Sequence, residues 1–115
     1  MIAVIFEVWP AEGATEDYLG LAADLRGKFE KVDGFIAIER FQSLSEPGKL
    51  LSLSFWRDED AVSAWRNHAG HRATQAKGRG GVFADYRLRV AHVLRDYGMT
   101  KRHAAPADSR RYHDT

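Results

Sequence analysis

The chain has 115 residues, with 17 basic and 16 acidic side chains and a formal net charge of +1 at neutral pH. This length suits one domain, and the balanced charge lacks the basic stripe that is typical of nucleic-acid-binding proteins. Because the chain has no cysteine, disulfides, thiolate catalysis and zinc sites with cysteine ligands are excluded.

The first half of the chain predicts a strand, a helix and a β-hairpin. Residues 2–9 are β-branched and aromatic on both sides, which predicts a strand that is covered on both faces. Apolar residues recur at helical spacing over roughly residues 15–32. Two further strands are expected over residues 35–44 and 50–56, and residues 45–48 form the turn between them.

The second half predicts another helix, a fourth strand and a tail. A helical stretch is expected over residues 58–79, with poor helix formers at 67–70 that predict a kink or a short break. Residues 86–97 alternate as a strand. Residues 99–115 are polar, and we expect a tail that is disordered or lies on a partner. The chain therefore divides into one domain over residues 1–98 and this tail.

The order of the expected elements, β-α-β-β-α-β, predicts an α+β fold of the ferredoxin-like type. In this fold both helices cover one face of a four-stranded antiparallel sheet. The first strand is also apolar on its second face, through Ala3, Ile5 and Trp9. We therefore expect a homodimer through the sheet faces, a dimeric α/β barrel. The alternative is that Ile5 and Trp9 are exposed edge residues.

The chain lacks the patterns that direct a protein to a membrane. Glu7 interrupts the apolar N-terminal run and no basic leader precedes it, so a signal peptide is not expected. No run approaches the roughly 20 apolar residues that span a bilayer. We expect a cytoplasmic protein without membrane or nucleic-acid partners.

The stretch from Trp65 to Gln75 carries the most unusual polar side chains. Four of them would share one face of a helix, namely His68, His71, Arg72 and Gln75. Such a stripe often faces solvent. The alternative is that Trp65 and His71 look into a pocket between the helices and the sheet, since small-molecule sites combine aromatic walls with a few polar groups. Two histidines are too few for a metal site, and none is expected.

Glu7 and Glu39 stand in strands that are otherwise largely apolar. A carboxylate in a covered sheet must be paired or neutral. One interpretation is an ion pair across strands with Arg40, Arg87 or Arg89. The other is that a buried carboxylate tunes a neighbouring base.

Trp56 and Tyr86 are interpreted as packing residues whose polar tips stay available to a ligand. The sequence contains no phosphate loop, dinucleotide fingerprint or Ser-His-Asp arrangement. We therefore expect no nucleotide cofactor and no serine nucleophile.

Four segments resemble the antibiotic biosynthesis monooxygenase family, namely residues 54–61, 64–68, 71–72 and 83–87. The likeness extends over roughly residues 1–98. It implies a dimeric α/β barrel with a pocket between the helices and the sheet of each subunit. It also implies oxidation of aromatic polyketides or quinols by molecular oxygen without metal or flavin, although other members bind and degrade heme.

The leading hypothesis is a cofactor-independent monooxygenase that acts on a small aromatic or quinol-type compound. In this hypothesis Trp65 packs against the ring and His71 accepts a proton. The candidate catalytic residues are His71, Trp65 and Glu7. The candidate substrate-binding residues are His68, Arg72, Gln75, Trp56 and Tyr86.

Two alternatives are a non-catalytic dimer that binds a small molecule and, less favoured, a heme-binding or heme-degrading protein. If the resemblance extended to the heme-degrading members, it would imply an asparagine on the first strand. It would also imply a tryptophan and a more distal histidine on the second helix. Trp65 matches this pattern, but Glu7 and Gln75 occupy the other two positions.

Overall fold

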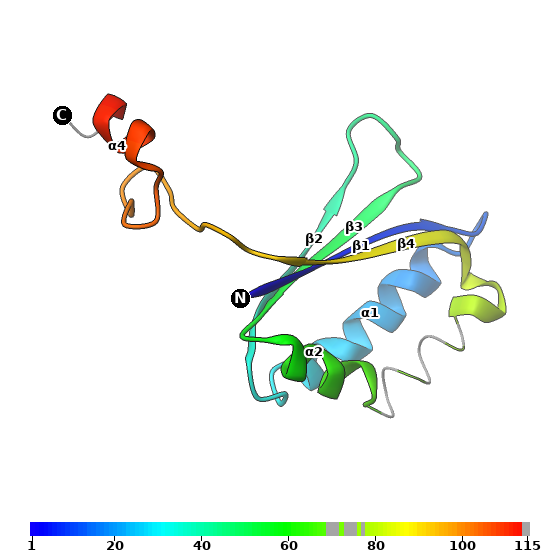
Figure 1. The fold of residues 1–115 in the computed structure, drawn as a ribbon. Coiled ribbons are helices and arrows are strands. Elements are labelled where there is room, and N and C mark those ends of the chain that lie inside the picture. The colour runs from blue at the N-terminus through cyan, green and yellow to red at the C-terminus, as the bar shows by residue number, and fades with distance from the viewer. Residues whose placement is uncertain (69–71, 73–75, 77, 114–115) are drawn as a thin grey trace.

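The structure is a computed structural model that describes residues 1–68, 72, 76 and 78–113. Its elements are β1 (Ile2–Pro10), α1 (Thr15–Phe29), β2 (Phe35–Gln42), β3 (Leu50–Trp56), α2 (Glu59–Arg66), η1 (Gly78–Val82), β4 (Phe83–His92) and α4 (Ala107–His113). The four strands form one antiparallel sheet in the order β2-β3-β1-β4. Both α1 and α2 lie on one face of this sheet (Figure 1). The predicted ferredoxin-like α+β fold is confirmed.

The two helices follow from apolar spacing and local capping. In α1 the buried side chains are Tyr18, Ala22, Leu25 and Phe29, which recur at intervals of three and four residues. The start of α2 is fixed by the Asp58 carboxylate, which accepts a hydrogen bond from the Ala61 backbone N–H at 2.9 Å.

Helix α2 ends at Arg66. This is where the poor helix formers from residue 67 onward predicted a break. The expected continuation of the helix toward residue 79 falls partly outside the described residues.

The central strand β3 alternates strictly between its two faces. Ser52, Ser54 and Trp56 point toward the helices and are buried. Because successive side chains of a strand point to opposite faces, Leu51, Leu53 and Phe55 lie on the other face. We call the face that carries these three residues the outer face and the face toward the helices the inner face.

The core occupies one end of the space between the inner face and the helices. Phe29 and Trp65 stack with their ring centroids 4.1 Å apart, and Trp56 lies 5.9 Å from Phe29. Ile2, Leu25 and Ala61 complete the buried cluster. Burial of each large side chain contributes roughly 1.5–3 kcal/mol, so this aromatic cluster is a main source of stability.

A bulge in β2 changes the face assignment that simple alternation predicts. Phe35 pairs with Trp56, but Ala37 pairs with Phe55, so the register shifts at Ile36. Simple alternation places Phe35 on the same face as Ala37. The bulge instead turns Phe35 to the inner face, where its ring contacts Trp56 at 5.3 Å.

Strand β4 begins and ends earlier than predicted. The expected strand over residues 86–97 is found at Phe83–His92. Its end is set by pairing, because His92 lies opposite Ile2, where β1 begins. Directly beyond it, the Val93 N–H donates a hydrogen bond to the Met1 carbonyl at 3.0 Å. No strand that the structure describes therefore lies beside the alternating residues 93–97.

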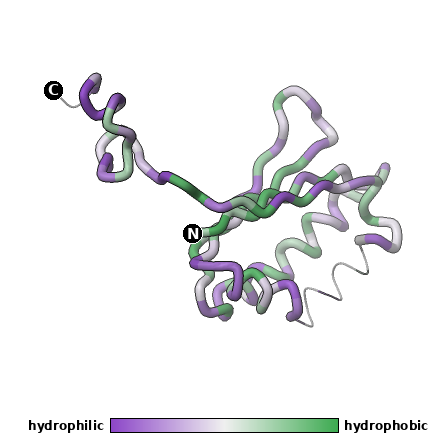
Figure 2. Tube along the Cα trace, in the orientation of Figure 1, coloured by the Kyte–Doolittle hydropathy of each residue, from purple (hydrophilic) through white to green (hydrophobic). Residues whose placement is uncertain are grey.

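The C-terminal segment leaves the domain after β4 and carries α4 well away from the sheet (Figure 1). Figure 2 shows hydrophobic residues concentrated along the strands, whereas α4 is mainly hydrophilic. Arg102 ties this segment together by donating to the Ser109 hydroxyl at 2.8 Å and to the Gly98 carbonyl at 3.1 Å. Among the described residues, no helix has the length and apolar character needed to cross a membrane.

Gly34 is the turn residue that joins α1 to β2, and we expect it to tolerate no side chain. Its φ of 93° is unfavourable for other residues, and an added Cβ would lie 2.7 Å from the Cβ of Ala61. Gly34→Ala should lower the free energy of unfolding by about 2–4 kcal/mol in urea titrations.

The matched control is Gly20→Ala in α1, where an added Cβ meets nothing within 4 Å. This variant should be neutral or more stable by roughly 0.5–1 kcal/mol. Equal stability of the two variants would show that the close approach at Gly34 has been misjudged.

Candidate functional site

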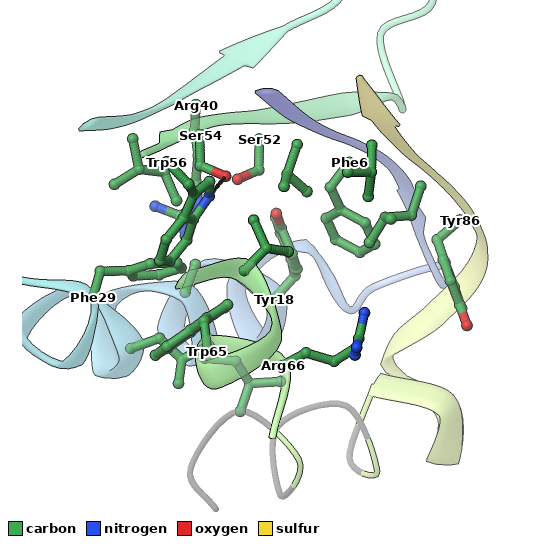
Figure 3. A pocket seen from close by; sticks show the side chains of 18 of the residues that line it. Phe6, Tyr18, Phe29, Arg40, Ser52, Ser54, Trp56, Trp65, Arg66 and Tyr86 are labelled. Carbon is green, nitrogen blue, oxygen red and sulfur yellow. Dashed lines mark hydrogen bonds between the residues drawn. The ribbon is translucent and has the colours of Figure 1, made fainter. Parts of the chain in front are cut away.

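A cavity of about 240 Å³ lies between the inner face of the sheet and helices α1 and α2. Phe29, Trp56 and Trp65 line one end, and Phe6 and Tyr86 line the other (Figure 3). A dry apolar cavity of roughly 150 Å³ holds benzene. This pocket therefore has room for a small ring compound.

The pocket exists because β3 places serines where a core strand usually places larger residues. Ser52 and Ser54 line it from the centre of the sheet. The Ser54 hydroxyl accepts a hydrogen bond from the buried Trp56 indole N–H at 2.9 Å (Figure 3). This bond satisfies the indole and fixes the ring as a rigid wall.

Arg40 and Tyr18 bring polar groups into the middle of the pocket. Arg40 comes from β2 and Tyr18 from α1 (Figure 3). The Arg40 Nε is buried without a hydrogen-bond partner. Burial raises the pKa of the Tyr18 hydroxyl, and the positive charge of Arg40 and its hydrogen bond to this hydroxyl partly oppose the rise. Tyr18 is therefore a neutral hydroxyl at physiological pH.

Two more arginines line the pocket. Arg79 donates a hydrogen bond to the Tyr86 hydroxyl at 2.6 Å. Arg66 extends from α2 toward the side on which Tyr86 lies (Figure 3) and reaches the Ser63 hydroxyl at 3.4 Å. No aspartate or glutamate is among the described lining residues, so the pocket carries an excess of positive charge.

The predicted site residues are distributed unevenly. Trp65, Trp56 and Tyr86 line the pocket. His68 is exposed and stacks on Trp65 with a centroid distance of 5.6 Å, outside the lining. Arg72 is also exposed and donates to the Asn67 side chain. His71 and Gln75 lie outside the described residues.

Glu7 lies on the outer face, away from the pocket. Its carboxylate pairs with Lys49 at 2.5 Å and with Arg89 on the neighbouring strand. The pKa of Glu7 is lowered, chiefly by the hydrogen bond from Lys49, with a further contribution from Arg89. The structure therefore places Glu7 in a cross-strand ion pair and does not bring it together with Trp65.

Sequence reasoning missed the polar centre of the pocket. The sequence offers Arg40 only as a possible partner for a carboxylate, and Tyr18 lies within residues 15–32, where the apolar spacing predicts only a helix. A usable signal was present, because Arg40 shares its strand face with Ile38, and the serines of the next strand recur with the same two-residue period. An arginine on a covered sheet face, beside small residues of the next strand, indicates a cavity in front of its side chain.

The described lining residues of the pocket do not provide an evident set of ligands for a metal ion or for heme. Within the part of the chain that the structure describes, no three His, Asp or Glu side chains form a metal-binding group. No described lining residue is a histidine. An axial imidazole for heme would have to come from elsewhere.

Comparison with known proteins connects this architecture to one family. Residues 1–77 match the family described as antibiotic biosynthesis monooxygenase. A jasmonate monooxygenase from Pyricularia oryzae is 50% identical over 93 residues, which span 81% of this chain and 43% of that protein. The chain thus spans less than half of that relative's length. An uncharacterised protein from Bacillus subtilis, YqjZ, is 33% identical over 81% of this chain and 79% of its own length.

Among solved structures, Rv0793 from Mycobacterium tuberculosis superposes with a TM-score of 0.76 at 18% identity. The match covers 84% of this chain and 98% of that one. At this identity the likeness demonstrates a common fold.

The Glu7 ion pairs should make stability dependent on pH. The pKa of Glu7 is lower in the folded chain than in the unfolded chain. The ionised carboxylate therefore adds to the free energy of unfolding above the unfolded pKa of about 4.3, and this contribution is lost as the pH falls through the folded pKa. Glu7→Gln should therefore lower the melting temperature at neutral pH, and the difference from wild type should shrink in acid.

Glu12→Gln is the matched control, since Glu12 is exposed in the loop after β1. It should melt like the wild type at both pH values. A Glu7→Gln deficit that is equally large in acid would contradict the ionic explanation.

Proposed function

Because this chain belongs to the antibiotic biosynthesis monooxygenase family, we propose that it is a monooxygenase of a small aromatic or quinol-type compound. The observation that carries the proposal is the apolar pocket between the helices and the sheet, which lies mostly within the matched residues. The 50%-identical relative, whose name describes a jasmonate monooxygenase, supports the reaction class.

The pocket suits a ring. Phe29 and Trp65 already stack on one another, so a planar ligand beside them would continue an aromatic layer. Phe6 and Tyr86 close the other end with centroids 5.7 Å apart. A bound ring that fills the apolar pocket would also shield a reactive anion from water.

The proposed reaction needs no cofactor if the substrate supplies the electrons. A ring methylene beside a hydroxyl or carbonyl group loses a proton, and the resulting carbanion reduces molecular oxygen. The methylene becomes a carbonyl, one oxygen atom stays in the product and the other leaves as water. Four electrons pass from the carbon to oxygen, so the reaction balances.

We keep His71 as the proposed base and Trp65 as the proposed ring contact. A base positioned for this step contributes typically 10²–10⁴-fold to the rate. Glu7 does not enter the proposed reaction, because its side chain lies on the opposite face of the sheet.

We further propose that the chain acts as a homodimer whose outer sheet faces meet. Leu51, Leu53 and Phe55 lie on that face beside Ile5 of β1, which pairs with Leu53. Such a contiguous apolar patch marks an interaction surface, and a second copy presents the same patch. The Glu7 ion pairs would lie within this interface.

Oxygen uptake should test the activity. We expect the purified chain to consume oxygen with quinol, anthrone-type or jasmonate substrates. For an anthrone-type substrate, which carries the ring methylene that the proposed step needs, one O₂ should be consumed per carbonyl formed when no reductant is added. Leu88→Trp should lower kcat/KM at least tenfold, about 1.4 kcal/mol, because Leu88 lines the pocket and a larger side chain at this position would occupy space that a ligand needs.

Leu44→Trp makes the same change at a fully exposed loop position and should leave kcat/KM unchanged. Ligand-dependent thermal stabilisation without oxygen uptake would identify a binding protein and overturn the enzymatic proposal. A Soret band on heme titration would instead favour the heme alternative.

Association should be tested by sedimentation equilibrium. We expect a dimer for the wild type and at least hundredfold weaker association for Leu53→Glu, about 2.8 kcal/mol, because a carboxylate would be buried at the centre of the outer face. Leu44→Glu is the control in the β2–β3 loop and should remain dimeric. A monomeric wild type, or a dimeric Leu53→Glu variant, would contradict the proposed interface.

A further inference from the structure

The charges around the pocket are unusual for an apolar cavity. Its described lining includes Arg40, Arg66 and Arg79 but no carboxylate. By contrast, Arg57 is neutralised by Asp33 and Asp58, and Arg89 pairs with Glu7. A cation near an apolar cavity is costly unless it is paired, so the lining favours a ligand that brings negative charge.

The three arginines differ in what they already bind. Arg79 donates to Tyr86, and Arg66 has a long contact with Ser63. Arg40 takes part in none of the ion pairs in the described part of the chain, and its guanidinium hydrogen-bonds an uncharged group, the Tyr18 hydroxyl. Its Nε is fully buried and has no hydrogen-bond partner. A buried N–H donor of this kind lacks an acceptor, and a ligand oxygen in the pocket would supply one.

The surroundings of Arg40 define a small polar patch on an otherwise apolar wall. Arg40 pairs with Ser52 across β2 and β3, and both residues line the pocket with Ser54. The Tyr18 hydroxyl points from α1 toward this patch (Figure 3), where it accepts a hydrogen bond from Arg40. Guanidinium and hydroxyl donors that converge on one point are a site for an oxyanion.

The protonation of Tyr18 fits this arrangement. Its side chain is only 5% exposed, and burial raises the pKa of its hydroxyl despite the neighbouring arginine. It therefore keeps its proton at physiological pH and can donate it to an anion. An ionised tyrosine would instead neutralise Arg40 and repel the ligand.

We propose that the pocket binds its substrate as a small ring-bearing organic anion, whose charged oxygen pairs with Arg40 and accepts a hydrogen bond from Tyr18. This inference rests on the proposed function, since it assigns a substrate class to the same pocket. The anionic oxygen could belong to a carboxylate or to an ionised phenol, and Arg40 recognises the charge that both share. The ring then lies along the aromatic walls at Trp65 and Trp56.

Matched pairs of probes test the proposal by binding alone, without turnover. Under argon, isothermal titration compares 1-naphthoate with 1-naphthamide, and ionised 4-nitrophenol with 4-nitroanisole. Each pair keeps the ring and differs in charge. The wild type should bind at least one anion tenfold or more tightly than its neutral partner, and the pair that shows the preference identifies the anionic group.

Three variants assign the preference to Arg40. Arg40→Met keeps the length of the side chain and should bind the anion at least tenfold more weakly, with the affinity for the neutral probe unchanged. Arg40→Lys keeps the charge and should retain part of the preference. Arg26→Met changes an exposed arginine of α1 outside the pocket and should bind like the wild type.

Equal binding of anion and neutral probe by the wild type would overturn the proposal. So would an Arg40→Met variant that keeps the preference, because a merely structural role for Arg40 would affect both probes alike. Arg40-dependent anion binding without oxygen uptake by any substrate would support this proposal while the proposed function fails. Oxygen uptake with neutral substrates only, unchanged by Arg40→Met, would overturn this proposal while the function stands.

Discussion

The alternation of β3 is the constraint on which both surfaces of the sheet depend. A strand shows alternate side chains to opposite faces, so its seven residues must divide between the helices and the outer face. Here the small residues Ser52 and Ser54 face the helices, and the large residues Leu53 and Phe55 face away. The same alternation therefore leaves space beneath the sheet and puts apolar bulk on top of it.

The pocket combines a rigid end with an accessible side. At one end Phe29, Trp56 and Trp65 are buried in the core, so the wall that a ring would contact is held by the same packing that stabilises the fold. Toward β4, Leu88 and Val90 line the pocket yet are each 47% exposed, which gives a ligand a way in. Rigid walls let a site select shape without the entropic cost of ordering its own side chains.

The sequence was sufficient for the fold but not for the polar centre of the site. Periodicity and turn residues located every strand and both main helices, because these signals are local. The end of β4 depends on where β1 begins, and the orientation of Phe35 depends on a bulge at Ile36, so neither follows from the segment itself. Arg40 was misjudged for a related reason, since an arginine in a strand is ordinarily assigned to solvent or to an ion pair until the register shows which face it occupies.

A structural change at the outer face also affects the pocket, because a single layer of strands separates them. Ser52 is flanked in the chain by Leu51 and Leu53, and Arg40 by Glu39 and Phe41, which point to the other side. Close packing transmits small backbone shifts across such a layer. A partner that covers the outer face would thus restrict the strands that aim Arg40 and the serines at the ligand. If the ligand bound that restricted arrangement more tightly, the bound ligand would strengthen the association of the two copies by the same factor as association strengthens ligand binding. The proposed dimerisation and the proposed substrate binding would therefore be thermodynamically coupled.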